Sequence, residues 1–161
     1  MHLFIISAAS ILLIVGSPAA IAQNNHAHSS GPSHATFELD TREFVKFPTQ
    51  LAEHTLANMR DHLQALQEIQ EHLGMGHPGE AARIAENRLG MSSLGLHGAH
   101  EVAKYMPQGM QDAGTAMHKA ASQFAIVATD SSVTSDMKPV FSALARLTSA
   151  CVGCHAGYRI R

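Results

Sequence analysis

Apolar residues recur at spacings of three and four over one long stretch of the chain, and this pattern limits the fold more than any other feature. Side chains three and four residues apart lie on the same side of an α-helix. The spacing therefore predicts one amphipathic helix with a single apolar stripe. This helix is expected to begin near Pro48, a residue tolerated in a first turn, and to run to about Leu73. The stripe consists of Leu56, Met59, Leu63, Leu66, Ile69 and Leu73.

The rest of the chain favours three further helices. Residues 74–79 contain three glycines and Pro78, which end the first helix. Beyond them we expect helices over about 79–96 and 110–129, the latter stopping at the polar residues 130–132. A last helix is expected from near Asp136 almost to the C-terminus, and no stretch is typical of a β-strand. We therefore predict an all-α fold, an up-down-up-down four-helix bundle.

The N-terminal region is interpreted as an export signal followed by a flexible lead-in. Residues 3–15 are mostly apolar, and Ala20-Ile21-Ala22 resembles the small-residue sites at which signal peptides are cleaved. The apolar stretch is short for a bilayer span, so residues 1–22 are predicted to be a cleaved signal peptide rather than an uncleaved anchor. The short region before it carries no Lys or Arg, which is unusual for such a signal. Residues 23–46 are polar and expected to be flexible, and residues 47–161 form the bundle.

Length and charge narrow the functional class. A chain of 161 residues with 45% hydrophobic residues can form one domain with a substantial core. Its net charge is −2 and its Lys and Arg residues do not cluster, so nothing favours nucleic-acid binding.

Both cysteines lie in the last eleven residues, in the segment Cys151-Val-Gly-Cys154-His155. Thiol–disulfide oxidoreductases place a C-x-x-C pair in a βαβ unit, and structural zinc sites usually have four ligands. Neither use suits a single pair at the end of a helix in an all-α chain. The third common use is covalent attachment of haem c, for which a histidine must directly follow the second cysteine. The thiols then form thioethers with the vinyl groups, and the imidazole binds the iron.

The helix carrying the two cysteines is expected to direct them inward. Cys151 and Cys154 are neighbours on one helix face. They continue an apolar stripe that the spacing predicts to face the core, so the haem is expected inside the bundle. The stripe consists of Met137, Phe141, Leu144 and Leu147.

The segment CVGCHAGYR resembles the C-x-x-C-H-x-x-Y-R signature of class II c-type cytochromes, the cytochrome c′ family. Residues 45–161 are also similar to that family in helix pattern and length. The resemblance implies a periplasmic four-helix bundle with Cys151 and Cys154 as thioether cysteines and His155 as the proximal iron ligand. It also implies that Tyr158 packs one turn beyond the attachment site and that Arg159 lies close to the haem. From the residues alone, Tyr158 could equally close the bundle end, and Arg159 could be a cation favoured at a helix C-terminus.

The second axial position of the iron decides the function. In the predicted bundle, the start of the first helix lies beside the end of the fourth, so the first helix supplies the candidates. Met59 belongs to the apolar stripe, and alignment with the family pattern brings it to this position or within one residue of it. His54 lies about 140° away around the helix, whereas His62 flanks the same face. Three outcomes stay open: ligation by Met59, an open or blocked site, and ligation by a histidine.

Other histidines are expected to be peripheral. His97 and His100 lie in a glycine-containing connection, which is typical of a solvated loop. His118 is expected at the rim of the third helix.

These features predict an exported protein with one covalent haem c that transfers single electrons between periplasmic redox partner proteins. The iron would be held by His155 and Met59, no substrate chemistry is implied, and we do not expect an enzyme. One alternative is a five-coordinate haem protein that binds NO or CO. Another is a thiol-redox or metal-carrying bundle without haem. Family members often pair through their first two helices, so the resemblance also allows a homodimer.

Overall fold

The computed structural model describes residues 39–160. The predicted signal peptide and residues 23–38 of the predicted lead-in lie outside this part. In chain order the elements are β1 (Glu43–Val45), α1 (Thr49–Gly74), α2 (Pro78–Arg88), the 3₁₀ helix η1 (Met91–Ser93), α3 (Ala99–Ala103), α4 (Gln108–Thr134), α5 (Lys138–Gly157) and β2 (Tyr158–Ile160). The structure is mostly helical, as the all-α prediction requires. Within the described residues, no helix combines the length and apolar character needed to cross a membrane.

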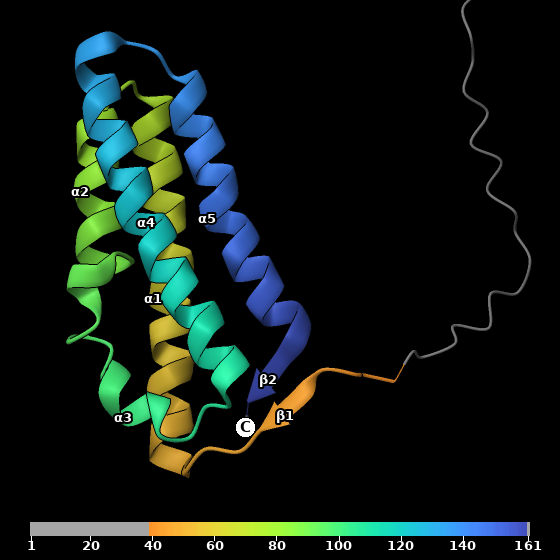
Figure 1. Ribbon diagram of the computed structural model, residues 1–161. Coiled ribbons are helices and arrows are strands. Elements are labelled where there is room, and N and C mark those ends of the chain that lie inside the picture. The colour runs from red at the N-terminus through yellow and green to blue at the C-terminus, as the bar shows by residue number, and fades with distance from the viewer. Residues whose placement is uncertain (1–38, 161) are drawn as a thin grey trace, which may run out of the picture. The chain divides into compact units, whose positions relative to one another are not determined.

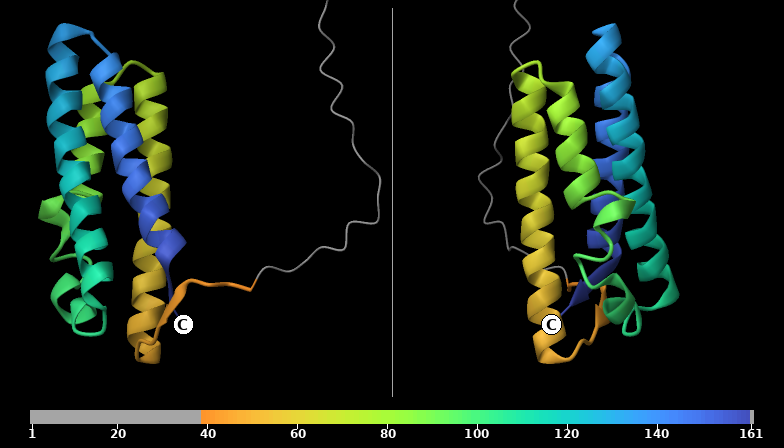
Figure 2. Two further views of the ribbon diagram at one scale, coloured as in Figure 1. Left: turned by 45° about the vertical axis from the view of Figure 1, so that its right-hand side comes forward. Right: turned by 90° about the vertical axis from the view of Figure 1, so that its left-hand side faces the viewer.

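Helices α1, α2, α4 and α5 lie side by side and alternate in direction (Figures 1 and 2). Helix α1 packs against α2, α2 against α4, and α4 against α5, whereas α1 and α5 do not form a comparably packed pair. Helix α3 lies near the end of the molecule where α1 begins. The main core fills the space between the four helices with fully buried side chains, among them Ile69, Leu89, Phe124, Val140 and Leu147.

The first and last helices follow from local sequence signals. Helix α1 starts directly after Pro48 and ends at Gly74, close to both predicted limits. The turn after it requires Gly76, whose φ of +75° is costly for a residue with a Cβ atom. Helix α5 starts at Lys138 with Pro139 in its first turn, where a missing N–H leaves no hydrogen bond unmade.

The second helix is shorter than predicted. Helix α2 ends at Arg88 rather than near residue 96. At Glu86, a side-chain oxygen accepts hydrogen bonds from the Ser92 backbone N–H at 3.2 Å and from the Ser92 hydroxyl at 2.7 Å, which folds the chain back. Gly90 makes this fold possible, because a Cβ atom there would lie 2.8 Å from the Cα of Glu86.

The third predicted helix is longer than expected, and a short helix precedes it. Helix α4 continues to Thr134, so the prediction that residues 130–132 stop it was wrong. Hydroxyl groups near this end bond to the helix itself: Thr129 donates to the carbonyl of Ala125 at 2.8 Å, and Ser132 to that of Thr129 at 2.6 Å. These bonds satisfy the polar side chains within the helix. The connection before α4 contains the unexpected helix α3.

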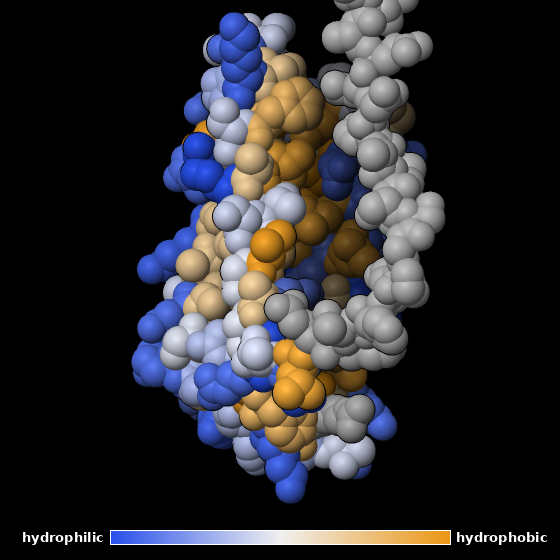
Figure 3. All heavy atoms as spheres, turned by 90° about the vertical axis from the view of Figure 1, so that its right-hand side faces the viewer, coloured by the Kyte–Doolittle hydropathy of each residue, from blue (hydrophilic) through white to orange (hydrophobic). Residues whose placement is uncertain are grey.

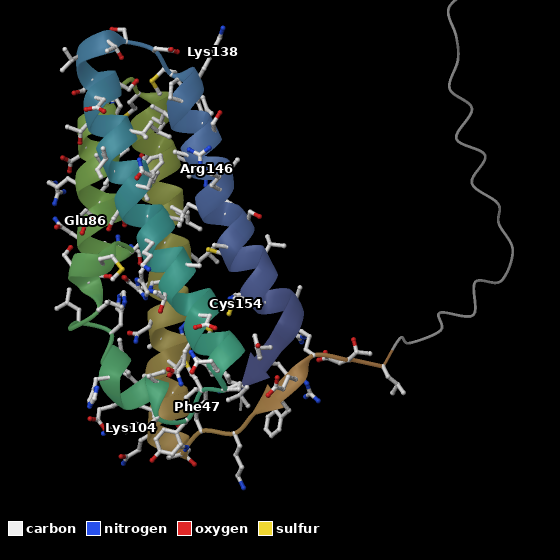
Figure 4. The ribbon with its side chains drawn as sticks, viewed as in Figure 1. Phe47, Glu86, Lys104, Lys138, Arg146 and Cys154 are labelled. Carbon is white, nitrogen blue, oxygen red and sulfur yellow. The ribbon has the colours of Figure 1, made fainter. Side chains whose placement is uncertain are left out.

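Two short strands correct the prediction that the chain has none. Strand β1 pairs in parallel with β2, with Glu43 opposite Tyr158 and Val45 opposite Ile160. Residues 39–46 are therefore a defined part of the fold rather than a flexible lead-in. Val45 and Phe47 are 5% and 4% exposed, and Figure 4 shows Phe47 beside the start of α1.

Two predicted apolar stripes are only partly buried. On α5 the buried residues are Val140, Ala143 and Leu147, whereas Phe141, about 100° around the helix from Val140, is 57% exposed. On α1, Ile69 is buried but Leu63 is 70% exposed. Each of these helices therefore buries only part of the apolar stripe predicted for it.

Candidate functional site

A cavity of about 780 Å³ lies between α1, the α3 region, α4 and the last three turns of α5. Its walls are mainly apolar. Leu63 and Val152 line it yet remain 70% and 63% exposed, so the cavity presents apolar side chains that the rest of the described chain leaves uncovered. Figure 3 shows apolar residues gathered in a recess on the α5 side of the molecule. Exposed apolar surface of this kind is typical of a ligand site.

Four residues singled out in the sequence converge on this cavity. Cys151, Cys154 and His155 line it from α5, and Met59 lines it from α1. The two cysteines lie one helical turn apart, so both side chains emerge on the same side of α5. Figure 4 shows Cys154 on the side of α5 that faces the other helices. The cavity therefore joins two thiols and an imidazole on one wall with a thioether on another.

The burial and the pKa of the two thiols indicate which kind of chemistry they suit. Both cysteines are free and partly buried. Burial raises the pKa of the Cys151 thiol and that of the Cys154 thiol. Reactive cysteines in redox enzymes have the opposite property, a lowered pKa that maintains the thiolate. The surroundings of this pair favour a structural or attachment role over thiol–disulfide exchange.

Three histidines from separate elements form a cluster on the same cavity: His62 of α1, His97 of the loop before α3, and His118 of α4. Their ring centroids are 4.6 Å apart for His62 and His97, 5.6 Å for His97 and His118, and 6.0 Å for His62 and His118. The Nε2 of His62 lies 3.4 Å from the Nδ1 of His97. The Nδ1 of His118 donates to the carbonyl oxygen of Leu89 at 2.7 Å. The cluster gives an apolar cavity one polar wall.

The positions of two of these histidines correct the sequence prediction. His118 is only 8% exposed and does not lie at a rim, and His97 is partly buried rather than in a solvated loop. The loop is fixed because its His97 carbonyl accepts hydrogen bonds from Asn58 at 3.0 Å and from His54 at 3.1 Å. His54 is not among the residues lining the cavity, in agreement with its predicted direction.

Burial governs the protonation of the cluster. Burial, together with the neighbouring His97 and His118, lowers the pKa of His62 to about 4. Burial, followed by the charge of His118, also lowers the pKa of His97. Asp61 opposes these effects but itself pairs with Arg88. His62 is therefore neutral at pH 7 and can act in the cavity only as a neutral hydrogen-bonding group.

The lowered pKa of His62 predicts a loss of stability in mild acid. Between pH 6.5 and 4 the unfolded chain binds a proton at this residue that the folded protein does not, so the free energy of unfolding falls as the pH falls through this window. The difference between the pKa of 6.5 in the unfolded chain and that of about 4 in the folded protein corresponds to about 3 kcal/mol in the free energy of unfolding. Urea unfolding at pH 7 and at pH 4 should show that His62→Gln loses less stability than the wild type, by about that amount.

A matched control is His100→Gln, which removes an exposed histidine from the neighbouring helix α3. This variant should lose as much stability on acidification as the wild type. Equal losses in the wild type and His62→Gln would show that His62 titrates normally in the folded protein.

Tyr158 and Arg159 are not among the residues that line the cavity. Tyr158 belongs to β2 and packs with the second apolar cluster, which contains Val45 and Phe47. Its hydroxyl lies so close to Gly109 that a Cβ atom there would overlap it. The Nε of Arg159 is 3.4 Å from a carboxylate oxygen of Asp40, and its guanidinium lies 5.3 Å from the centre of the Phe44 ring. Contact of either residue with a cofactor stays a prediction.

Comparison with models of protein families, with curated protein sequences and with solved structures gave no match. Among residues 39–160, no group of three or more His, Cys, Asp or Glu side chains is arranged to hold a metal ion. The case for a function therefore rests on the chemistry of the cavity and on the sequence motif that reaches into it.

Proposed function

We propose that this protein is an exported monohaem c-type cytochrome that carries single electrons between periplasmic redox partners. The observation that carries the proposal is the convergence of Cys151, Cys154, His155 and Met59 on one apolar cavity. The thiols and the imidazole come from a C-x-x-C-H motif. The thioether comes from a helix 92 positions earlier in the chain.

The cavity and its donor set are compatible with haem c. A volume of about 780 Å³ is within the range of cofactor and ligand pockets, and the walls are largely apolar. Two thiols one turn apart on α5 match the attachment motif, and imidazole and thioether are both established axial ligands of haem iron. The neutral thiols also remain available for thioether formation, because nothing in the described chain pairs them. Helices α1, α2, α4 and α5 would act as the up-down-up-down four-helix bundle that encloses this site.

Each residue would have a distinct role. Cys151 and Cys154 would attach the cofactor to α5 through thioether bonds, and the imidazole of His155 would bind the iron. Met59 would supply a soft, neutral ligand suited to both iron oxidation states, which raises the reduction potential relative to two histidines. Bound haem iron would supply the one-electron Fe(III)/Fe(II) couple. The apolar walls would exclude water, and rigid packing between the helices would keep rearrangement small during electron transfer.

A second function has support from a specific observation. The imidazoles of His62 and His118 lie on the same cavity as Met59. If Met59 did not bind the iron, the imidazole of His62 could donate a hydrogen bond to a small exogenous ligand such as NO, since polar donors near an open iron site govern ligand binding. This alternative uses the same haem attachment and differs only at the sixth iron position.

The absorption spectra of the ferric and ferrous protein, produced with haem-attachment machinery, distinguish the two functions. Low-spin spectra with the weak far-red ferric band of a methionine–iron bond would support electron transfer. A high-spin ferrous spectrum that changes on addition of CO would support ligand binding instead. A protein without bound haem would contradict both.

A further inference from the structure

The segment 39–47, here called the strap, is fastened to the part of the chain that follows the C-x-x-C-H motif. Its strand β1 pairs in parallel with β2, and β2 begins directly where α5 ends. Figures 1 and 2 show the strap lying along the C-terminal end of the chain. A two-stranded sheet has little stability of its own, so other contacts must hold the strap in place.

Apolar contacts hold one end of the strap. Val45 and Phe47 are almost fully buried and belong to a second apolar cluster with Ala52, Val102 and Met110. Of these, Val102 and Met110 also line the cavity. The buried end of the strap therefore supports the wall of the cavity at the end of the molecule where α1 begins.

Charged contacts hold the other end, next to the proposed proximal ligand. Arg42 donates hydrogen bonds to the carboxylate of Asp40, at 2.9 Å from Nε and 2.8 Å from Nη2. Its Nη1 donates to the backbone carbonyl oxygen of His155 at 3.5 Å. Asp40 also forms an ion pair with Arg159 of β2 at 3.4 Å. The Arg42 hydrogen bond is the main reason that the pKa of the Asp40 carboxyl is lowered, so Asp40 stays ionised.

Arg42 contacts α5 at its C-terminal end, where backbone carbonyl groups lack partners within the helix. The last four carbonyl groups of a helix have no partner within the helix, and that of His155 is one of the last four in α5. A cation at a helix C-terminus is also favoured by the helix dipole. Arg42 thus satisfies the carbonyl of the residue that carries the proposed iron ligand, and it places a positive charge beside it.

We propose that Arg42 and Asp40 are positioning residues for His155 and that their charges set the reduction potential of the haem. The proposal rests on the haem-binding function above. The positive charge of Arg42 favours the ferrous state, which carries one positive charge fewer, and therefore raises the potential. The negative charge of Asp40 offsets part of this effect. The strap is thus a part of the redox site that lies outside the C-x-x-C-H motif.

Two charge-changing variants of the full haem-loaded chain test this, by spectroelectrochemical titration at low and high salt. Arg42→Gln should shift the ratio of reduced to oxidised protein at a fixed potential toward the oxidised form, and Asp40→Asn toward the reduced form, each by roughly two- to tenfold. Both shifts should shrink at high salt, because the groups are partly exposed. Arg42→Lys should retain most of the wild-type potential.

Lys46→Gln is the matched control. It removes the same charge from an exposed position in the strap, and Lys46 forms no ion pair with another described residue. It should shift the potential much less than Arg42→Gln.

Shifts of the reduction potential in opposite directions in Arg42→Gln and Asp40→Asn would support a role for the two charges. If the residues were only structural, both variants would loosen the same contacts and move the potential in the same direction. Unchanged potentials, or shifts of equal sign, would overturn the inference while leaving the haem proposal in place. Absence of covalent haem in the wild type would overturn both.

Discussion

Met59→Ala is expected to convert a low-spin, six-coordinate haem protein into a high-spin protein that binds carbon monoxide. Met59 is the thioether that α1 contributes to the cavity, which the motif on α5 also lines. An internal ligand that leaves the iron open for about 1% of the time lowers the apparent affinity for an external ligand about a hundredfold. Removing it should raise the CO affinity of the ferrous protein by that order, measured by optical titration.

Met117→Ala is a matched control for this experiment, because Met117 lines the same cavity from α4. It should remain low-spin and bind CO as weakly as the wild type. If Met59→Ala stayed low-spin, Met59 would not be the ligand. A wild type that was already high-spin would instead favour the ligand-binding function, with Met59 only filling space.

Replacing both Cys151 and Cys154 by serine is expected to abolish covalent haem attachment completely. These are the only cysteines in the chain, so no other thiol can form a thioether. Each single variant should retain one thioether and a reduced yield of bound haem. Haem staining after denaturing electrophoresis measures the result directly, because only covalently bound haem survives the separation.

Val152→Ala tests whether the loss of covalent haem attachment is specific to replacement of the thiols. Val152 lies between the two cysteines and lines the cavity with a largely exposed side chain. Its replacement should leave covalent attachment intact. Haem that remained bound to the double cysteine variant after denaturation would contradict thioether attachment.

The parts of the fold that the sequence predicted are those encoded locally. The three- and four-residue spacing, together with Pro48 and the glycines after Leu73, predicts α1 to within a residue or two at either end. Pro139 likewise places the start of α5. The pair of cysteines and the adjacent histidine follow from one short motif, and the structure brings them to a cavity together with Met59.

The parts that the sequence missed depend on contacts between distant residues. The sequence predicts that His62 flanks the face of Met59, but it gives no sign that His97 and His118, on two other elements, join it at the cavity. Only packing of α1, the loop and α4 brings their rings within 6.0 Å of one another. The end of α2 was missed because it depends on the Glu86 side chain binding back to Ser92.

The strap was missed for the same reason, although a weak local signal exists. Buried Val45 and Phe47 alternate with exposed Phe44 and Lys46, a pattern compatible with a short strand that has one buried side. Its partner β2 lies more than 100 residues away in the sequence. A three-residue strand of this kind gains its stability from tertiary contacts, which local periodicity does not encode.

The central claim is that Cys151 and Cys154 hold one haem covalently in the cavity. The most direct test is the intact mass of the exported protein, measured under denaturing conditions after production with haem-attachment machinery. We predict the mass of the processed chain plus one haem, with no thiol left to react with an alkylating reagent. A mass equal to the bare chain, with two reactive thiols or one disulfide, would contradict the account.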